Sequence, residues 1–402
     1  MCNSRRTGNF FEICPESPYS GHPGDRVLKN SGANNRKSTA RKSIRTLYCE
    51  NVLASFPCYD GREECLSTHD RYSRQIRFAP FGAGGQENLS AATVAIVGCG
   101  ALGTVQASLL ARAGVGAIRL IDRDYVEESN LQRQLLYTEA DARQALPKAE
   151  AARRHLAEAN AGIRIEAHIA DLNPENADDL LSGAAVILDA TDNFETRYLI
   201  NDYSLREGIP WIYGAAVGAY GIAMPVVPGE SACFRCIYPD APSGAQPTCE
   251  TAGVLGPVTS LIGSVQAMEA IKILAGRAGS VRQKIFTADL WQGPIREMAM
   301  PPRDPECLCC GKHQYPHLNG RRAPVSLCGR NAVQIHELRR PLNLPALARQ
   351  LEGLGRIRSN EFALRFTTGD YDVTAFPDGR AIIKGTTDIG IARGVYARYI
   401  GH

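Results

Sequence analysis

The 402-residue chain lacks several features that would assign it to a class at once. Its formal net charge of +3 is too small to argue for a nucleic-acid partner. Residues 1–20 hold charged side chains and no apolar run, so the sequence predicts no secretory signal. The most apolar long stretch, 254–275, includes Glu269 and Lys272 and has helical periodicity, which favours a buried helix over a membrane span. No fixed-period repeat is present in the sequence.

Cysteine, in contrast, is plentiful. The thirteen cysteines are an odd number in a chain without a predicted signal, which favours a reducing, cytoplasmic setting where paired cysteines bind metal more often than they form disulfides. Cys233 and Cys236 form one CxxC pair, and the run Cys307-Leu-Cys309-Cys310 supplies a second. Four thiolates with this spacing suit a tetrahedral Zn²⁺ ion, and because they leave no open position the zinc would be structural.

Short apolar runs alternate with segments of helical length from residue 71 onward. Residues 1–70 show no sustained periodicity and are expected to be a poorly ordered leader. The alternation predicts an α/β domain with a doubly wound, Rossmann-like and mostly parallel sheet. Its expected strands are 93–98, 117–122, 164–170 and 184–191. Its expected helices are 103–114 and 148–160.

The pattern changes after Gly214, where we expect a mixed-sheet extension that completes a first domain over 71–311. Its expected elements are two strands, 216–227 and 283–290, with a long helix, 256–275, between them.

Residues 324–402 follow a polar linker and are expected to form a small α+β accessory domain. They are predicted as a strand, a helix, three strands and a helix, with a tight hairpin signal at Asp378-Gly379. The stretch 356–369 is expected to be one of the three strands.

The stretch Val94 to Gly103, VAIVGCGALG, has the spacing of a turn that brings backbone N–H groups against a phosphate. GxGxxG spacing alone is a weak signal, but here the turn follows a predicted strand and opens a predicted helix. Asp122 ends the next strand, where a carboxylate would bind ribose hydroxyls. These features alone would favour an NAD-dependent oxidoreductase.

The loop after Asp122 favours ATP instead. A nicotinamide slot has no use for many polar donors near the phosphates, whereas cleavage between the α and β phosphates of ATP requires the leaving pyrophosphate to be neutralised. Lys148 follows Pro147 at a predicted helix start and is a further positively charged side chain that could bind phosphate. The polar residues that crowd the loop are Asp124, Asn130, Gln132, Arg133 and Gln134.

A group of polar side chains, Asp189, Asp192 and Asn193, ends the last strand of the predicted parallel sheet. Doubly wound folds bind ligands at this end of their strands. A carboxylate there can hold Mg²⁺, which bridges phosphates, so Asp192 is a candidate magnesium ligand.

With these motifs in view, the chain resembles the ThiF/MoeB/HesA adenylyltransferases, relatives of the ubiquitin-activating enzymes. The resemblance extends from Arg71 to about Gly311. It rests on several stretches in fixed order: RYSRQI, GCGALG, DRDYVEESNLQRQ, PKAEAA, DATDNFETR, CFRC, TCETAGVLGPV, IGSVQAMEAIKILAG and CLCCG.

The resemblance implies an enzyme that uses Mg-ATP to adenylate the C-terminal glycine of a ubiquitin-like sulphur carrier of the MoaD or ThiS type, with release of pyrophosphate. The acyl-adenylate would then accept sulphur from a donor such as a cysteine desulphurase or a rhodanese, for molybdopterin or thiamine thiazole synthesis. It also implies a homodimer, in which Arg74 of one subunit reaches the ATP site of the other.

The resemblance further implies the ATP contacts and the catalytic groups. Ala101 stands where many relatives have glycine, which is tolerable if its φ stays negative. Asp124 is expected either to bind ribose or to cap its loop. Arg133, Lys148 and Asp192 are expected to act in catalysis together with Arg74. The implied ATP contacts are Gly98, Gly100, Ala101, Gly103, Asp122, Asp124, Ser129, Asn130, Leu131, Gln132, Arg133, Lys148, Asp192 and Asn193.

Two further expectations concern cysteines. The family pattern CxxCG selects Cys310, with Cys307, Cys233 and Cys236, as the fourth zinc ligand and leaves Cys309 spare. Cys249 corresponds to a cysteine that is covalently joined to the carrier in some relatives and dispensable in others, so both a nucleophile and a structural loop residue stay open.

Three alternatives stay open beside carrier adenylation. An NAD-dependent oxidoreductase would bind NAD and would not exchange pyrophosphate with ATP. A non-catalytic binding module of the same fold would lack the arginine, lysine and aspartate that this chain has at Arg133, Lys148 and Asp192. A tRNA-modifying dehydratase is possible within the family, although those relatives generally lack the four-cysteine site. The segment 324–402 is interpreted as an accessory or carrier-docking module.

Overall fold

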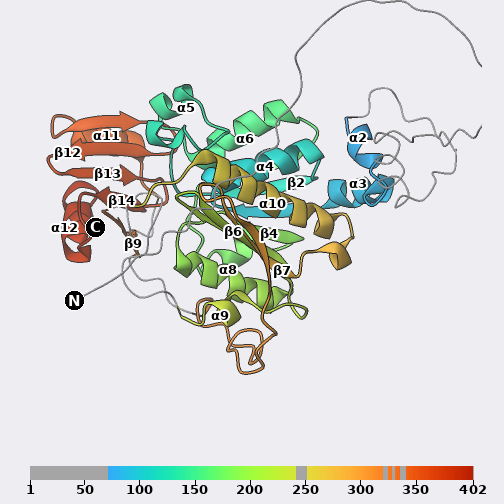
Figure 1. Cartoon of the computed structure of the whole chain (residues 1–402). Helices are drawn as coiled ribbons and strands as arrows, with labels where there is room; N and C mark the ends of the chain where they lie inside the picture. The colour runs from blue at the N-terminus through green and yellow to red at the C-terminus, as the bar shows by residue number, and fades with distance from the viewer. Residues whose placement is uncertain (1–70, 241–250, 320–324, 328–330, 336–340, 402) are drawn as a thin grey trace, which may run out of the picture. The chain divides into compact units, whose positions relative to one another are not determined.

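Two sheets organise the molecule, which we describe from a computed structural model (Figure 1). The structure describes residues 71–240, 251–319, 325–327, 331–335 and 341–401. All of them belong to one compact unit, residues 63–402. The expected leader, 1–70, lies outside the described residues.

The first sheet has eight strands in the order β3-β2-β1-β4-β5-β6-β7-β8. Strands β3 to β5 run parallel and β5 to β8 antiparallel, so the predicted doubly wound sheet with a mixed extension is confirmed. Its strands are β1 (Thr93–Val97), β2 (Ala117–Ile121), β3 (Arg164–His168), β4 (Val186–Asp189), β5 (Trp211–Val217), β6 (Tyr220–Val226), β7 (Lys284–Asp289) and β8 (Ile295–Ala299).

Helices accompany this sheet along the chain and cover both of its faces. They are α2 (Ser73–Ile76), α3 (Gly82–Ala91), α4 (Ala101–Ala113), α5 (Glu139–Gln144), α6 (Lys148–Ala159), α7 (Ala177–Leu181), α8 (Phe194–Glu207), α9 (Phe234–Ile237) and α10 (Gly256–Leu274), with short 3₁₀ turns η1 (Glu128–Asn130) and η2 (Ala278–Ser280).

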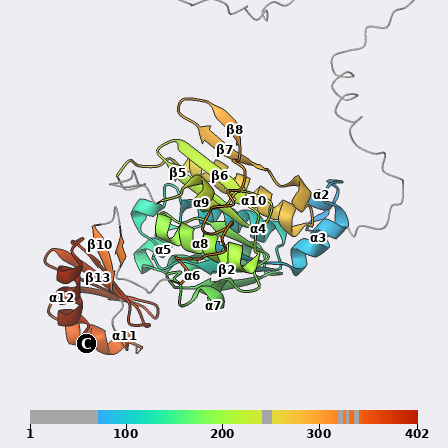
Figure 2. The same cartoon turned by 90° about the horizontal axis from the view of Figure 1, so that it is seen from below.

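Strand β1 shows why the sheet is buried on both faces. Its side chains alternate, so Val94 and Ile96 pack in one cluster with residues of α4, α6 and α10. Ala95 and Val97 pack in a second cluster with residues of α7 and α8. Figures 1 and 2 show these helices on the two faces of the sheet. An apolar run without polar alternation is what a strand covered on both faces requires.

Two predicted single strands are hairpins in the structure. The end of the expected strand 216–227 is β6, and its first residues belong to β5, because Gly218, with φ of +62°, reverses the chain between them. The expected strand 356–369 is likewise divided at Asn360. The side chain of Asn360 accepts hydrogen bonds from the N–H groups of Phe362 and Ala363, which builds a turn that apolar periodicity does not reveal.

The second sheet belongs to the C-terminal module, by which we mean the described residues from 325 to 401. Its six strands have the order β11-β12-β13-β14-β10-β9. The predicted hairpin at Asp378-Gly379 joins β13 to β14, and Gly379 has a φ of +86°. The elements are β9 (Val325–Leu327), β10 (Ala332–Ile335), α11 (Leu344–Leu351), β11 (Arg356–Ser359), β12 (Leu364–Thr368), β13 (Tyr371–Ala375), β14 (Ala381–Lys384) and α12 (Ile389–Tyr399).

Alternation along these strands gives the module's sheet two different faces. Val333, Phe366, Val373 and Ile383 are buried in one cluster with residues of α11 and α12. Their neighbours in sequence, which include Gln334 on β10, point to the opposite face. No helix among the described residues is long and apolar enough to cross a membrane.

Candidate active site

The candidate nucleotide site forms where three parallel strands end together. Val97 on β1 is the register partner of Ile121 on β2 and of Asp189 on β4. The residues that follow them, Gly98, Asp122 and Ala190, therefore leave the sheet side by side. This is the carboxyl edge at which doubly wound sheets bind ligands, and the topology brings three predicted segments to it.

The glycine turn is closely packed against its neighbours. Gly98 has a φ of +96°, and a Cβ there would lie 2.5 Å from the carbonyl oxygen of Ala190. A Cβ on Gly103 would lie 2.0 Å from the carbonyl oxygen of Gly98. Gly100 is the N-cap of α4 and has no side chain with which to cap the first N–H groups, and such groups at a helix start bind phosphate. Ala101 is the first residue of α4 and is not among the described residues with positive φ, so its methyl group causes no backbone strain.

This packing predicts the effect of a methyl group at Gly103. We expect Gly103→Ala to lower the free energy of unfolding by about 1–3 kcal/mol and to raise the Kd for ATP about tenfold, because the turn must open. Thermal melting and calorimetric titration with ATP measure the two effects. Gly84→Ala is the matched control, since no atom lies within 4 Å of its Cβ position in α3. Normal ATP binding by Gly103→Ala would show that the turn can relax freely.

Asp122 holds the glycine turn to the end of β2. Its carboxylate accepts hydrogen bonds from the N–H of Cys99 at 2.6 Å and from the N–H of Asp124 at 2.7 Å. Burial raises the pKa of Asp122, and the nearby Lys148 ammonium opposes that rise. Asp124 pairs with Lys148, with 3.3 Å between Oδ2 and Nζ, so three of the predicted residues meet at one place.

Sequence reasoning assigned no role to Tyr137, which joins two parts of the site. Its buried hydroxyl lies 2.7 Å from the carbonyl oxygen of Cys99 and 3.1 Å from that of Lys148. The ring thus fixes the spacing between the glycine turn and the start of α6. Tyr137 follows Leu135 and Leu136, so the local sequence gives no signal that would have marked it.

The loop from Ser129 to Arg133 combines exposed groups with structural ones. Asn130 is buried, and its side-chain oxygen accepts from the N–H of Glu127 at 3.1 Å, which closes the cap of η1. Leu131 packs against the apolar cluster of α4 and α6. Ser129 and Gln132 are exposed, and Arg133 donates to the carbonyl oxygen of Ser129 at 2.8 Å.

The segment after β4 presents a carboxylate at the same edge. Asp192 is exposed, whereas Asn193 caps α8 by accepting from the N–H of Thr196 at 2.8 Å. Arg197 holds the segment in place, because it pairs with buried Asp189 at 3.2 Å and donates to the carbonyl oxygen of Thr191 at 2.6 Å. Sequence reasoning gave Arg197 no role beyond its place in the motif DATDNFETR.

The two other expected catalytic residues are Arg74 and Cys249. Arg74 is exposed on α2, and its expected role concerns the other subunit of a dimer. Cys249 lies outside the described residues.

Four cysteines form a cluster near α9, at the lower end of the core in Figure 1. All four sulphur atoms lie within 4.8 Å of one another, with Sγ–Sγ distances of 3.8 Å for Cys233–Cys236, 3.6 Å for Cys233–Cys307 and 3.3 Å for Cys236–Cys310. A tetrahedral zinc with Zn–S bonds of usual length separates its sulphur ligands by about 3.8 Å. Cys309 turns away and donates to Oδ1 of Asp202 at 3.0 Å. The donor set and its spacing fit zinc.

The family model for the ThiF family matches residues 72–309, which is more than half of the chain. The chain belongs to the ThiF family.

Relatives within the ThiF family agree with this placement. The sulfur carrier protein ThiS adenylyltransferase of Bacillus subtilis is 42% identical over 337 residues, which cover 82% of this chain and 99% of that protein. The sulfur carrier protein adenylyltransferase of Thermus thermophilus is 39% identical and covers 60% of this chain and 90% of its own. A crystal structure of E. coli MccB with ATP superposes with a TM-score of 0.55 at 25% identity, over 68% of this chain and 83% of that one.

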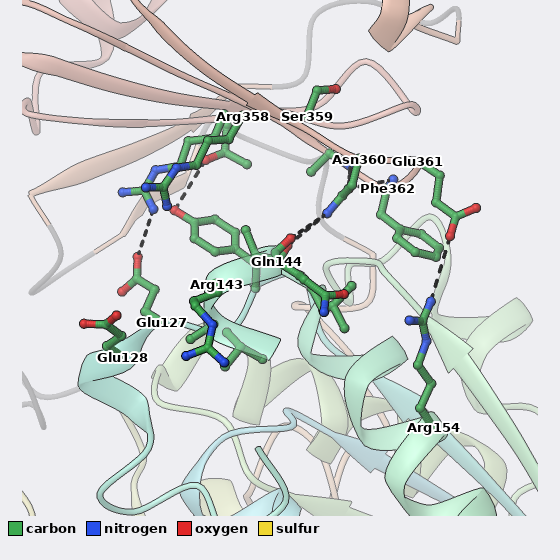
Figure 3. Close-up of a pocket in the computed structure, with 18 residues that line it drawn as sticks. Glu127, Glu128, Arg143, Gln144, Arg154, Arg358, Ser359, Asn360, Glu361 and Phe362 are labelled. Atoms are coloured by element: carbon green, nitrogen blue, oxygen red, sulfur yellow. Dashed lines mark hydrogen bonds and ion pairs between the residues drawn. The ribbon is translucent and has the colours of Figure 1, made fainter. Parts of the chain in front are cut away.

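A cleft of about 1150 Å³ lies where the ThiF-family segment meets the C-terminal module (Figure 3). Glu127, Glu128 and Arg154 line it from the ThiF-family side, and the hairpin that includes Arg358 and Asn360 lines it from the module. None of the predicted ATP contacts lines this cleft. It adjoins them through Tyr125 to Glu128, the residues directly before Ser129.

Proposed function

We propose that the protein adenylates the C-terminal glycine of a ThiS-type sulphur carrier with Mg-ATP and releases pyrophosphate. The observation that carries this proposal is the meeting of the glycine turn, Asp122 and Lys148 at one edge of the sheet, in a chain that is 42% identical to a ThiS adenylyltransferase over 82% of its length. A non-catalytic module would not need to keep Arg133, Lys148 and Asp192.

The residues of this chain would act mainly by position and charge. The turn from Gly98 to Gly103 and the start of α4 would bind phosphate, and Asp122 would bind ribose. A carboxylate oxygen of the carrier attacks the α phosphorus, the bond to the β-phosphate oxygen breaks, and pyrophosphate leaves with the electron pair. Lys148 and Arg133 would neutralise the leaving pyrophosphate, with Arg74 from the partner subunit of a homodimer.

Two metals are part of the proposal. Magnesium neutralises phosphate charge, and the exposed carboxylate of Asp192 at the strand end would hold it. Zinc would be held by Cys233, Cys236, Cys307 and Cys310 and would be structural, since four thiolates complete its tetrahedron. The free cysteines among the described residues are consistent with the reducing cytoplasm that we propose as the location.

The extent of the similarity favours ThiS over MoaD as the carrier type. An alignment over 82% of the chain is too long to lie within residues 72–309, so the Bacillus ThiS adenylyltransferase also shares sequence beyond the ThiF-family segment. We propose that the acyl-adenylate then accepts sulphur from a separate donor, such as a cysteine desulphurase or a rhodanese, on the way to the thiamine thiazole. Cys249 remains a candidate for a covalent intermediate with the carrier.

Carrier-dependent ATP–pyrophosphate exchange tests the function. We expect purified, zinc-replete protein to exchange labelled pyrophosphate into ATP with a ThiS-like carrier about tenfold or more faster than with a MoaD-like carrier at equal concentration, because fit at the carrier tail changes transition-state binding. A carrier that lacks its terminal glycine is the control. Equal exchange with both carriers would contradict the ThiS assignment, and no exchange with either would overturn the proposed function.

A further inference from the structure

One face of the C-terminal module is turned toward the loops that carry the predicted ATP contacts. Arg365, Thr374, Ile382 and Gln334 are directly paired across β12, β13, β14 and β10, so their side chains share one face of the sheet. The other face is covered by α11 and α12. Ile382 packs in a small cluster that includes Ile169 from the segment after β3, so this face packs on the ThiF-family segment.

The first contact is with the loop between Asp124 and Ser129. Lys384 pairs with Glu127 at 2.8 Å, and the Arg365 guanidinium lies 4.0 Å from the same carboxylate. Tyr125 is 7% exposed, and its ring lies 5.3 Å from Arg365 and 5.8 Å from Lys384. Although burial alone would raise the pKa of Glu127, Lys384 and Arg365 lower it below its usual value, so the carboxylate stays ionised at neutral pH.

The second contact reaches Asp124 through a chain of charges. Gln334 donates to Oδ2 of Asp171 at 2.8 Å, and Oδ1 of Asp171 pairs with Arg123 at 2.7 Å. Arg123 lies 4.0 Å from Asp124, which is paired with Lys148. The module thus contacts the loop directly at Tyr125 and Glu127 and reaches Asp124 indirectly, through Asp171 and Arg123.

A third contact spans the cleft of Figure 3. Asn360 donates to the carbonyl oxygens of Gln144 and Ala145, both at 3.2 Å, and Glu361 lies 3.9 Å from Arg154. Ala145, with φ of +49°, ends α5 two residues before Pro147, where α6 and Lys148 begin. The module therefore also touches the segment that leads into Lys148.

We infer that the C-terminal module is a brace for nucleotide binding, in which Lys384 and Gln334 are positioning residues that hold the loop from Arg123 to Arg133 in its ATP-binding form through Glu127 and Asp171. This inference rests on the proposed function, because that loop is assigned there to ATP. Glu127 is well placed to transmit the effect, since its side chain and backbone close the cap of η1 with Asn130.

The test is a double-mutant cycle in the full chain, read out as the Kd for ATP by calorimetry without carrier. We expect Lys384→Met and Glu127→Gln each to raise the Kd about five- to tenfold. The double variant should raise the Kd no more than Glu127→Gln alone, because Glu127→Gln already removes the ion pair with Lys384. Lys384→Arg should restore most of the affinity. Lys284→Met is the matched control, because Lys284 and Glu297 form a pair at 3.0 Å on β7 and β8.

A second readout separates positioning from general stability. In ATP–pyrophosphate exchange we expect Lys384→Met and Gln334→Leu to raise the KM for ATP about five- to tenfold, with kcat changed less than about twofold. This pattern is expected when a variant weakens ATP binding equally in the ground state and in the transition state. An unchanged Kd in Lys384→Met, or an equal rise in Lys284→Met, would overturn the inference, as would wild-type protein that binds no ATP. Normal ATP binding without exchange would overturn the proposed function and leave the brace intact.

Discussion

Lys148→Met lowers kcat/KM for carrier-dependent ATP–pyrophosphate exchange by about 100- to 1000-fold, the loss typical of one removed charge-stabilising donor. Lys148 is 6% exposed, so its ammonium acts where water screens it little. It also lies 3.3 Å from Asp124, close to the turn that would bind phosphate. Steady-state exchange assays at saturating carrier measure the loss.

We expect the loss of kcat/KM to depend on where the removed lysine lies, and a lysine outside the site tests this. Lys272 on α10 pairs with Glu269 at 2.8 Å and is also partly buried, and Lys272→Met should leave kcat/KM within about twofold because it removes a lysine without touching the site. Melting temperatures of both variants control for unfolding. A folded Lys148→Met with wild-type exchange would remove Lys148 from the proposed mechanism.

Cys310→Ser removes the metal and much of the stability of the ThiF-family segment. We expect wild-type protein to carry about one zinc ion per chain by elemental analysis, and Cys310→Ser to carry less than about a tenth of that, since three thiolates hold zinc far less well than four. The melting temperature should fall by about 10 °C or more, because binding energy of the metal is folding energy in such sites.

The neighbouring cysteine supplies the control for this prediction. Cys309 is fully buried one position before Cys310, yet its thiol points to Asp202 and not into the cluster. Cys309→Ser should therefore retain its zinc, with a far smaller loss of melting temperature. Equal zinc loss in the two variants would contradict the assignment of Cys310, and not Cys309, as the fourth zinc ligand.

The glycine turn, its strand and its helix could be predicted from sequence because local signals agree there. An unbroken apolar run, a GxGxxG spacing and the following helix all point to one structure, and β1 and α4 lie within a few residues of the prediction. Asp122 and Lys148 could be proposed as nucleotide contacts because one lies directly after a strand and the other at a helix start, and the structure places Asp122 against the turn and Lys148 beside Asp124.

Other parts of the site depend on contacts that no local pattern encodes. Tyr137 bridges Cys99 and Lys148 through its hydroxyl group, 38 and 11 positions away in the chain. The face of the module that meets Tyr125 and Glu127 carries Arg365, Lys384 and Gln334, and alternating polar residues predict equally well a face open to water. Only the folded structure shows that this face is covered.

The cysteine cluster has a topological consequence. Cys233 is 74 positions from Cys307, and Cys236 is 74 positions from Cys310, so one bound metal would close the intervening chain into a ring that contains α10, β7 and β8. If the metal acts as a covalent cross-link does, a link of this span lowers the conformational entropy of the unfolded chain and so stabilises the folded state by about 4 kcal/mol. Because that gain rises only with the logarithm of ring size, insertions between the two cysteine pairs should change it little. The ring could therefore lengthen in evolution, for example in its loops, while both of its ends stay fixed to the same core.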